Sequence, residues 1–138
     1  MSGKSVPSAT PETRQYWEHT AQNEVWMPKC EQHGWVFPPR PHCPTCGTRP
    51  LAWQQLSGKG TIASFIISHR AGVGYQDEVP YFIIIVDTAE GPRMVGNLYG
   101  VPVTPESVTI GMPVEVFFED REGVHVPQWR PVGSTVTL

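Results

Sequence analysis

Short apolar stretches fill the second half of the chain and predict β-strands. Residues 81–86 (Tyr-Phe-Ile-Ile-Ile-Val) show no polar alternation, which is typical of a central strand that is covered on both faces. Residues 61–69, 93–98 and 124–130 have the apolar content of further strands, and turn residues separate them. This punctuation favours a sheet over a helical bundle.

One further strand has two different faces. Residues 114–119 alternate, and the two sets are Val114, Val116 and Phe118 on one face and Glu115, Phe117 and Glu119 on the other. Phe117 is an aromatic ring on the polar face, so we consider it a candidate for contact with a ligand or partner. We interpret the paired acidic residues of the chain, Asp77–Glu78 and Glu119–Asp120, as solvated charges.

The first half of the chain predicts one helix between polar segments. Thr10 is suited to the N-cap position and Pro11 to the first helical position, and the helix is expected to run to about Gln22. Residues 1–9 are polar and are expected to be mobile. Residues 71–79 contain two glycines and two acidic side chains and are also predicted to form a mobile loop.

The order of these elements predicts a mainly β protein in two parts. Residues 1–50 would form the N-terminal helix and a strand–turn–strand ribbon, and residues 51–138 a small barrel with a C-terminal tail. The 13 glycines and 15 prolines suit short strands joined by turns. Five or six strands fit a closed barrel of OB type. An open antiparallel sheet and another small barrel remain alternatives, since periodicity does not separate them.

The ribbon carries two pairs of potential metal ligands, Cys30 with His33 and Cys43 with Cys46, each separated by two residues. Such pairs can complete a tetrahedron, so we predict a structural Zn²⁺ site with these four ligands. One alternative is a disulfide with one free thiol. A rubredoxin-like iron site is another, although it would use four thiolates. His42 is out of phase with the turn and is interpreted as a surface residue or a neighbour of the ligands.

Composition disfavours two classes of partner. The net charge is −3, with 10 basic and 13 acidic residues and no run of Lys or Arg, whereas nucleic-acid binding depends on basic residues that contact phosphates. No apolar segment approaches the roughly 20 residues that a membrane helix needs. The polar N-terminal residues do not resemble a signal peptide, so we expect a cytoplasmic protein that binds neither nucleic acid nor membrane.

Four motifs occur in an order that resembles one known family. They are Phe-Pro-Pro-Arg at 37–40, Cys-Pro-x-Cys at 43–46, Ser-Gly-x-Gly-Thr at 57–61 and Ile-Gly-Met-Pro-Val at 110–114. The family is the acyl-CoA-associated zinc-ribbon/OB-fold family, long described as a domain of unknown function. The resemblance extends from about residue 12 to residue 131. The family pattern usually has Cys where this chain has His33.

The resemblance implies a helix and rubredoxin-like zinc ribbon joined to an OB barrel, acting as an accessory subunit of acyl-CoA enzymes. It implies partners among thiolases and the thiolase-like, lipid-transfer-protein-type aldolases of steroid side-chain breakdown, with hotdog-fold hydratases as a further class. We therefore expect a thiolase-fold partner, in a heterotetramer that binds acyl-CoA at the shared interface. The acyl group is not specified by the sequence.

A catalytic set is not evident in the sequence. The three thiols are assigned to metal, no Gly-x-Ser-x-Gly motif occurs, and His69 and His125 are candidate bases at strand ends. Our favoured hypothesis is a non-catalytic subunit. The candidates for contact with CoA or a partner are Arg40, Arg93, Trp17, Trp35 and Phe117. The alternatives are a single-stranded nucleic-acid module and an independent acyl-CoA hydratase or thioesterase.

Overall fold

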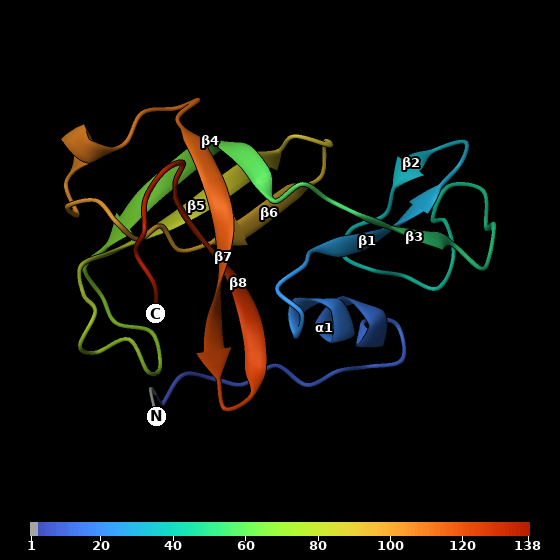
Figure 1. Ribbon diagram of the computed structural model, residues 1–138, viewed down its shortest axis with the longest axis horizontal. Coiled ribbons are helices and arrows are strands. Elements are labelled where there is room, and N and C mark those ends of the chain that lie inside the picture. The colour runs from blue at the N-terminus through green and yellow to red at the C-terminus, as the bar shows by residue number, and fades with distance from the viewer. Residues whose placement is uncertain (1–2) are drawn as a thin grey trace.

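The computed structural model describes residues 3–138, and its larger part is built around a five-stranded antiparallel barrel (Figure 1). The strands are β4 (Lys59–Ser68), β5 (Tyr81–Thr88), β6 (Arg93–Gly96), β7 (Pro113–Arg121) and β8 (Val124–Pro131). Their spatial order is β6-β5-β4-β7-β8, and a short 3-10 helix, η1 (Pro105–Ser107), lies between β6 and β7 in sequence. A parallel bridge between Leu98 and Trp129 nearly closes the barrel. The predicted OB-type barrel is confirmed.

Strand β5 is central, but its two faces differ in burial. Phe82, Ile84 and Val86 have no exposed surface and point into the barrel. Ile83 and Ile85 alternate with them and are only partly buried. The expectation that this strand is covered on both faces is therefore wrong for the described residues, because no second layer packs on the outside of β5.

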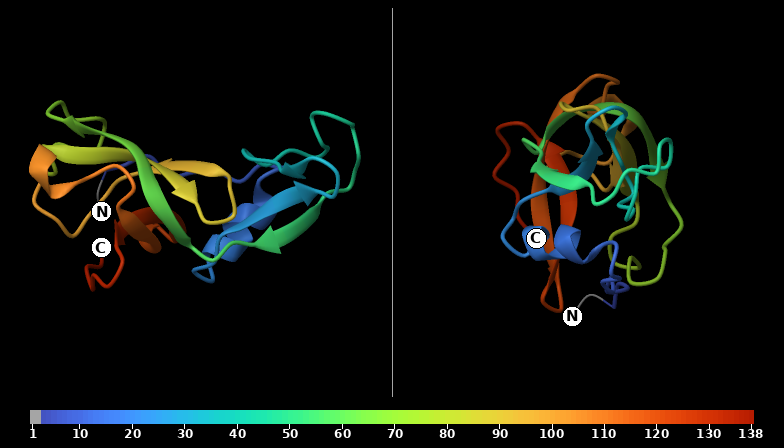
Figure 2. Two further views of the ribbon diagram at one scale, coloured as in Figure 1. Left: turned by 90° about the horizontal axis from the view of Figure 1, so that it is seen from above. Right: turned by 90° about the vertical axis from the view of Figure 1, so that its right-hand side faces the viewer.

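The ribbon is a separate three-stranded sheet beside the barrel (Figure 2, left). Its strands are β1 (Trp26–Cys30), β2 (Gly34–Trp35) and β3 (Ala52–Gln55), in the order β2-β1-β3. Strand β3 pairs with β1 from Gln55 opposite Trp26 to Ala52 opposite Lys29. Thus β3 belongs to the ribbon sheet, although the sequence grouped it with the barrel. The division of the chain at residue 50 stays a prediction.

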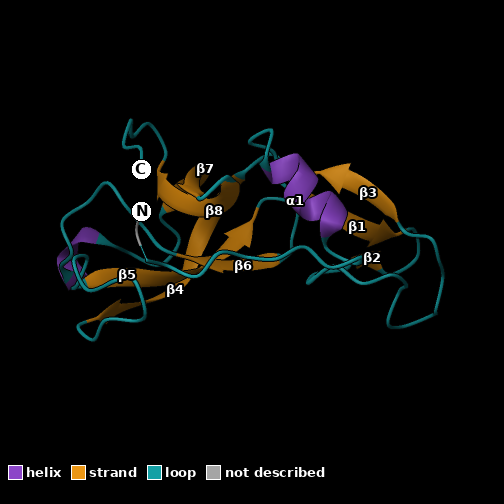
Figure 3. Ribbon diagram, turned by 90° about the horizontal axis from the view of Figure 1, so that it is seen from below, coloured by secondary structure: helices purple, strands orange, loops and turns teal. Residues whose placement is uncertain are grey.

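The helix α1 (Arg14–Thr20), drawn in purple in Figure 3, lies beside the ribbon strands. It begins later than predicted. Its N-cap position is Thr13 rather than Thr10. The Thr10 amide donates to Thr13 Oγ1 at 2.9 Å, and the Thr13 amide donates to the Thr10 carbonyl at 3.1 Å. These contacts form a turn before the helix, because threonine side chains compete for backbone groups near helix ends.

One hydrophobic core joins the helix, the ribbon and the barrel. Its fully buried centre is in the barrel, and it extends to Tyr16 of α1 and to Val25 and Met27 at the base of the ribbon. The helix packs against β1 and β8. A second, small cluster in the ribbon contains Cys30, Val36, Cys43 and Leu51. No helix within residues 3–138 has the length and apolar character that a membrane span requires.

Candidate functional site

Four potential metal ligands converge in the ribbon. Cys30 ends β1, His33 lies in the turn before β2, and Cys43 and Cys46 lie in the loop that precedes β3. All four ligand atoms lie within 4.8 Å of one another. Cys30 Sγ is 3.8 Å from His33 Nδ1 and 3.7 Å from Cys46 Sγ, and Cys43 Sγ is 3.7 Å from His33 Nδ1. The structure therefore brings together the four residues that the spacing indicated.

These distances fit a tetrahedral zinc ion. Zn–S bonds of about 2.3 Å and Zn–N bonds of about 2.0 Å at tetrahedral angles place ligand atoms about 3.5–3.8 Å apart. Three thiolates and one imidazole are a common donor set for structural zinc, and four protein ligands leave no position for a substrate. The site therefore fits a structural Zn²⁺ whose role is to fold the ribbon.

Local backbone geometry prepares the ligand turns. Gly34 and Gly47 each follow the second ligand of a pair and have φ angles of 82° and 75°, which residues with a Cβ rarely adopt. The Gly47 amide donates to the Cys43 carbonyl at 2.8 Å and closes the second turn. The Thr48 hydroxyl, 3.0 Å from Cys46 Sγ, and the Thr48 amide lower the pKa of Cys46 to about 6. This favours the thiolate that metal binding needs.

Phe117 of β7 is largely buried. It is only 6% exposed, so little of its ring is accessible, and its contact with CoA or a partner stays a prediction. The Arg130 guanidinium lies over its ring at 5.1 Å, and Tyr99 packs edge-on at 6.0 Å. The cause is tertiary: Tyr99, which follows β6, and Arg130 of β8 cover this face of β7.

The two candidate tryptophans of the N-terminal part are half-buried. Trp17 packs edge-on against Tyr16 with ring centroids 5.0 Å apart, and it also contacts the main core. Trp35 also packs against that core, and the Lys29 ammonium lies over its ring at 4.9 Å. Packing within the chain thus accounts for much of both rings, and their contact with a partner remains a prediction.

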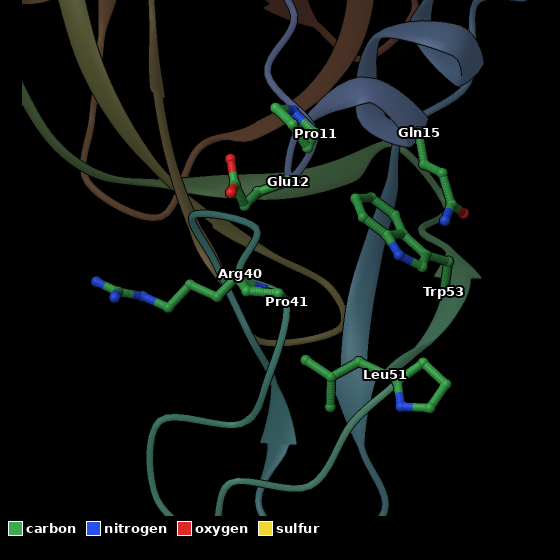
Figure 4. A pocket seen from close by; sticks show the side chains of 8 residues that line it. Pro11, Glu12, Gln15, Arg40, Pro41, Leu51 and Trp53 are labelled. Carbon is green, nitrogen blue, oxygen red and sulfur yellow. The ribbon is translucent and has the colours of Figure 1, made fainter.

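Arg40 lies at the rim of a hollow of about 220 Å³ between the start of α1 and the ribbon (Figure 4). The lining residues are Pro11, Glu12, Gln15, Arg40, Pro41, Pro50, Leu51 and Trp53. Figure 4 shows the Arg40 side chain extending away from the Trp53 ring rather than into the hollow. The guanidinium is therefore placed for contact outside the hollow.

The other charged candidates lie elsewhere in the barrel. Arg93 begins β6, and its Nε is 2.7 Å from Asp87 Oδ1 in an exposed ion pair. His69 follows β4 and is exposed, whereas His125 lies in β8 with Nδ1 2.9 Å from Asn23 Oδ1. A catalytic role for either histidine remains a hypothesis from the sequence.

A buried ion network was missed by sequence reasoning. Lys4 Nζ lies 2.6 Å from Glu78 Oε2 and 2.7 Å from Glu119 Oε2, and the Lys4 and Glu119 side chains are 2% and 8% exposed. Arg121 Nη2 is 2.9 Å from Glu119 Oε1, and Tyr75 packs under the Lys4 ammonium at 4.3 Å. The interpretation of Glu119 as a solvated charge is therefore wrong.

The same contacts correct the expectation for the N-terminal segment. Lys4 is buried against the 71–80 loop, while Met1 and Ser2 lie outside the described residues. Gly74 permits this approach, since a Cβ there would clash with the backbone nitrogen of Lys4. No local signal in the sequence could have identified this network, because its members come from three distant segments.

Comparison with known proteins identifies the family. Residues 17–52 match the model described as "ChsH2, rubredoxin-like zinc ribbon domain", and residues 53–119 match "ChsH2, C-terminal OB-fold domain". The chain belongs to the ChsH2 family. A "DUF35 domain-containing scaffold protein" of Pyrococcus furiosus is 33% identical over 85% of this chain and 90% of its own length. The resemblance inferred from the four motifs is thereby confirmed, and so is the zinc-ribbon assignment.

Two further similar proteins are named as parts of enzymes. The "3-oxo-4,17-pregnadiene-20-carboxyl-CoA hydratase alpha subunit" of Mycobacterium tuberculosis is 30% identical over 91% of this chain, which spans only 39% of that subunit. A solved chain of the "Ltp2-ChsH2(DUF35) aldolase" superposes with a TM-score of 0.79 at 28% identity, covering 91% of this chain and 98% of that one. A Sulfolobus solfataricus DUF35 structure, at 15% identity and a TM-score of 0.63, shares the fold.

Proposed function

We propose that this chain is a non-catalytic scaffold subunit that binds a thiolase-fold enzyme and supports acyl-CoA binding at the shared interface. The observation that carries the proposal is the likeness to the chain of the Ltp2-ChsH2 aldolase, which extends over 98% of that chain. A whole-length match of this kind includes both the ribbon and the barrel. The ribbon and the barrel of this chain therefore account for nearly the whole of that chain.

The chemistry of the chain supports a binding role. The three cysteines belong to the metal cluster, where four protein ligands leave no open coordination position. A structural ion that folds a small ribbon provides a rigid platform, which lowers the entropic cost of binding a partner. Arg40, which extends outward, remains a candidate for a CoA phosphate or a partner carboxylate, since a guanidinium can bind either with two hydrogen bonds.

Co-expression tests the proposal directly. The chain would be produced with the thiolase-fold protein encoded nearest to its gene, and the mixture analysed by size-exclusion chromatography with light scattering. We expect co-elution at the mass of a heterotetramer, one zinc per scaffold chain, and higher enzyme activity than with the enzyme alone. Separate elution together with unchanged enzyme activity would reject the scaffold function.

A hydratase is the second candidate partner. The observation in its favour is the similarity to the hydratase alpha subunits of Mycobacterium tuberculosis and Thermomonospora curvata. Because the chain covers only 39% and 29% of these subunits, hydratase activity itself is not assigned to it. The chain would also be co-expressed with a hotdog-fold hydratase from the same genome. The protein that co-elutes with the chain, the thiolase-fold protein or the hydratase, is then its partner.

A further inference from the structure

The barrel has an apolar surface on the outside of β4, β5 and β6. We define this β4–β6 outer face by four aliphatic residues, Ile66, Ile83, Ile85 and Val95. Ile66 lies opposite Ile83, and Ile85 lies opposite Val95, so the four side chains form adjacent cross-strand pairs. Ile66 is 57% exposed and Val95 is 67% exposed.

No helix or additional strand within residues 3–138 packs on this outer face. Helix α1 packs against β1 and β8, away from these three strands. The inner residues Phe82, Ile84 and Val86 already supply the barrel core. Ile83 and Ile85 are therefore not needed inside, yet they give β5 the continuous apolar run that is typical of a strand covered on both faces.

The position of this face in the fold is also informative. Counted from β4, the strands β5 and β6 are the second and third strands of the OB barrel. In OB folds the face of these two strands commonly binds the ligand. Single-stranded nucleic acid would need stacking aromatics and free cations on such a face. The four residues that define the β4–β6 outer face are aliphatic. Tyr81, at the start of β5, stacks on Tyr75 with ring centroids 4.8 Å apart, and Arg93 is paired with Asp87.

Charge and area indicate which occupant fits. The neighbouring cross-strand pair is Asp87 with Arg93, which neutralise each other, so an anionic surface meets no net positive charge here. A neutral, apolar protein surface is complementary to this face. Four aliphatic side chains expose far less than the ~800 Å² per partner that a stable interface buries. A symmetric dimer through this face alone is thus too small, whereas a larger partner can also contact neighbouring elements.

We propose that the β4–β6 outer face is the docking surface for an apolar region of the thiolase-fold partner. This inference rests on the proposed function and specifies where the enzyme binds. Arg93, at the end of the face, would lie at the polar rim of the interface, where charges affect specificity and association rate more than affinity.

Single aspartate substitutions on the face and at a control position test this assignment. Val95→Asp places a carboxylate in the proposed interface, and Val73→Asp makes the same change at a valine that is 80% exposed in the 71–80 loop. Ile66→Asp is a second variant of the face. Circular dichroism and thermal unfolding should be close to wild type for all three variants. Partner affinity, measured by titration calorimetry, should fall at least tenfold for Val95→Asp and Ile66→Asp and stay within twofold for Val73→Asp.

Hydrogen exchange of the unmodified complex gives an independent measurement. Peptides from β5 and β6 should exchange more slowly when the partner is bound. If wild type binds the partner but both face variants bind equally well, or if Val73→Asp weakens binding as much, the docking assignment is wrong and the scaffold function stands. If wild type binds no thiolase-fold protein, the proposed function itself fails. A wild-type dimer that Val95→Asp dissociates would assign the face to a second copy and also overturn the inference.

Discussion

Replacing Lys4 with methionine tests whether the buried ion network fastens the N-terminal segment to the barrel. The Lys4 ammonium contacts Glu78 at 2.6 Å and Glu119 at 2.7 Å, and the Lys4 side chain is 2% exposed. Methionine keeps most of the aliphatic volume and removes the charge. Glu119 then keeps Arg121 Nη2 at 2.9 Å and Gln128 Nε2 at 3.0 Å, but it loses the partner of its second oxygen.

The expected cost is about 3 kcal/mol of unfolding free energy, because removing one member of a buried ion pair leaves the other poorly compensated. In a chain of 138 residues this corresponds to a fall in Tm of about 10 °C. The matched control is Lys59→Met. Lys59 Nζ lies 3.2 Å from Glu115, but its side chain is 55% exposed, so that pair contributes at most about 1 kcal/mol.

The pH dependence gives a second test of the same network. Burial alone would raise the pKa of Glu119, but the hydrogen bonds from Lys4 and Gln128 outweigh burial and lower it below its ordinary 4.5. As the pH falls, the unfolded state therefore binds the proton before the folded state does. The contribution of Glu119 to the unfolding free energy is fully present above pH 4.5, and it is lost as the pH falls through the lower pKa of the folded state. Burial would lower the pKa of Lys4, but hydrogen bonds to Glu119 and Glu78 raise it above 10.5, so its contribution is lost only above pH 10.5.

Urea unfolding of wild type, Lys4→Met, Glu119→Gln and the double variant between pH 3 and 8 measures these effects. We expect the difference between wild type and Lys4→Met to shrink below pH 4.5. The double variant should lose less than the sum of the single losses, because the two side chains are coupled. A loss for Lys4→Met no greater than for Lys59→Met, constant over the whole pH range, would refute the reasoning.

Three further predictions concern the ribbon and the barrel. His33→Ala should lower Tm and reduce the zinc content, measured by elemental analysis, to well below one ion per chain. His33→Cys should keep the metal, because a thiolate replaces the imidazole in the tetrahedron. Equal zinc contents in the two variants would contradict this prediction. Gly60→Ala should cost about 1–3 kcal/mol in urea unfolding, because its Cβ would lie 2.7 Å from the Asp87 carbonyl. Gly72→Ala, with its nearest atom at 3.5 Å, is the control and should stay within about 0.5 kcal/mol. Trp129→Ala should cost about 3–5 kcal/mol by the same measurement, since Trp129 is 1% exposed; a cost below 1 kcal/mol would contradict its place in the core.

Local patterns account for the correct predictions. The zinc ligands lie in two short turns, so spacing and the glycines that follow determine most of their geometry. The strands of the barrel were evident because side chains alternate along each strand and turn residues separate them. The start of α1 was misplaced by three residues because Thr10 and Thr13 bond to each other, and either threonine could have served as the cap.

The remaining features depend on contacts between distant segments. Nothing near Lys4 or Glu119 in sequence indicates their pairing, since 115 residues separate them and only the folded barrel brings them together. Burial of Phe117 likewise depends on Arg130 and Tyr99, which reach it from another strand and from the segment after β6.

The amino-acid sequence determined the metal site and the strand content, because these follow from local spacing and periodicity. The barrel type was indicated by the resemblance of the four motifs to a known family, since periodicity did not separate it from an open sheet or another small barrel. The tertiary structure decided which apolar and charged side chains are buried, because burial depends on what the rest of the chain places beside them. Strand β5 shows the difference: its apolar residues were read correctly as a central strand, but only the fold revealed that Ile83 and Ile85 face outward without a covering layer.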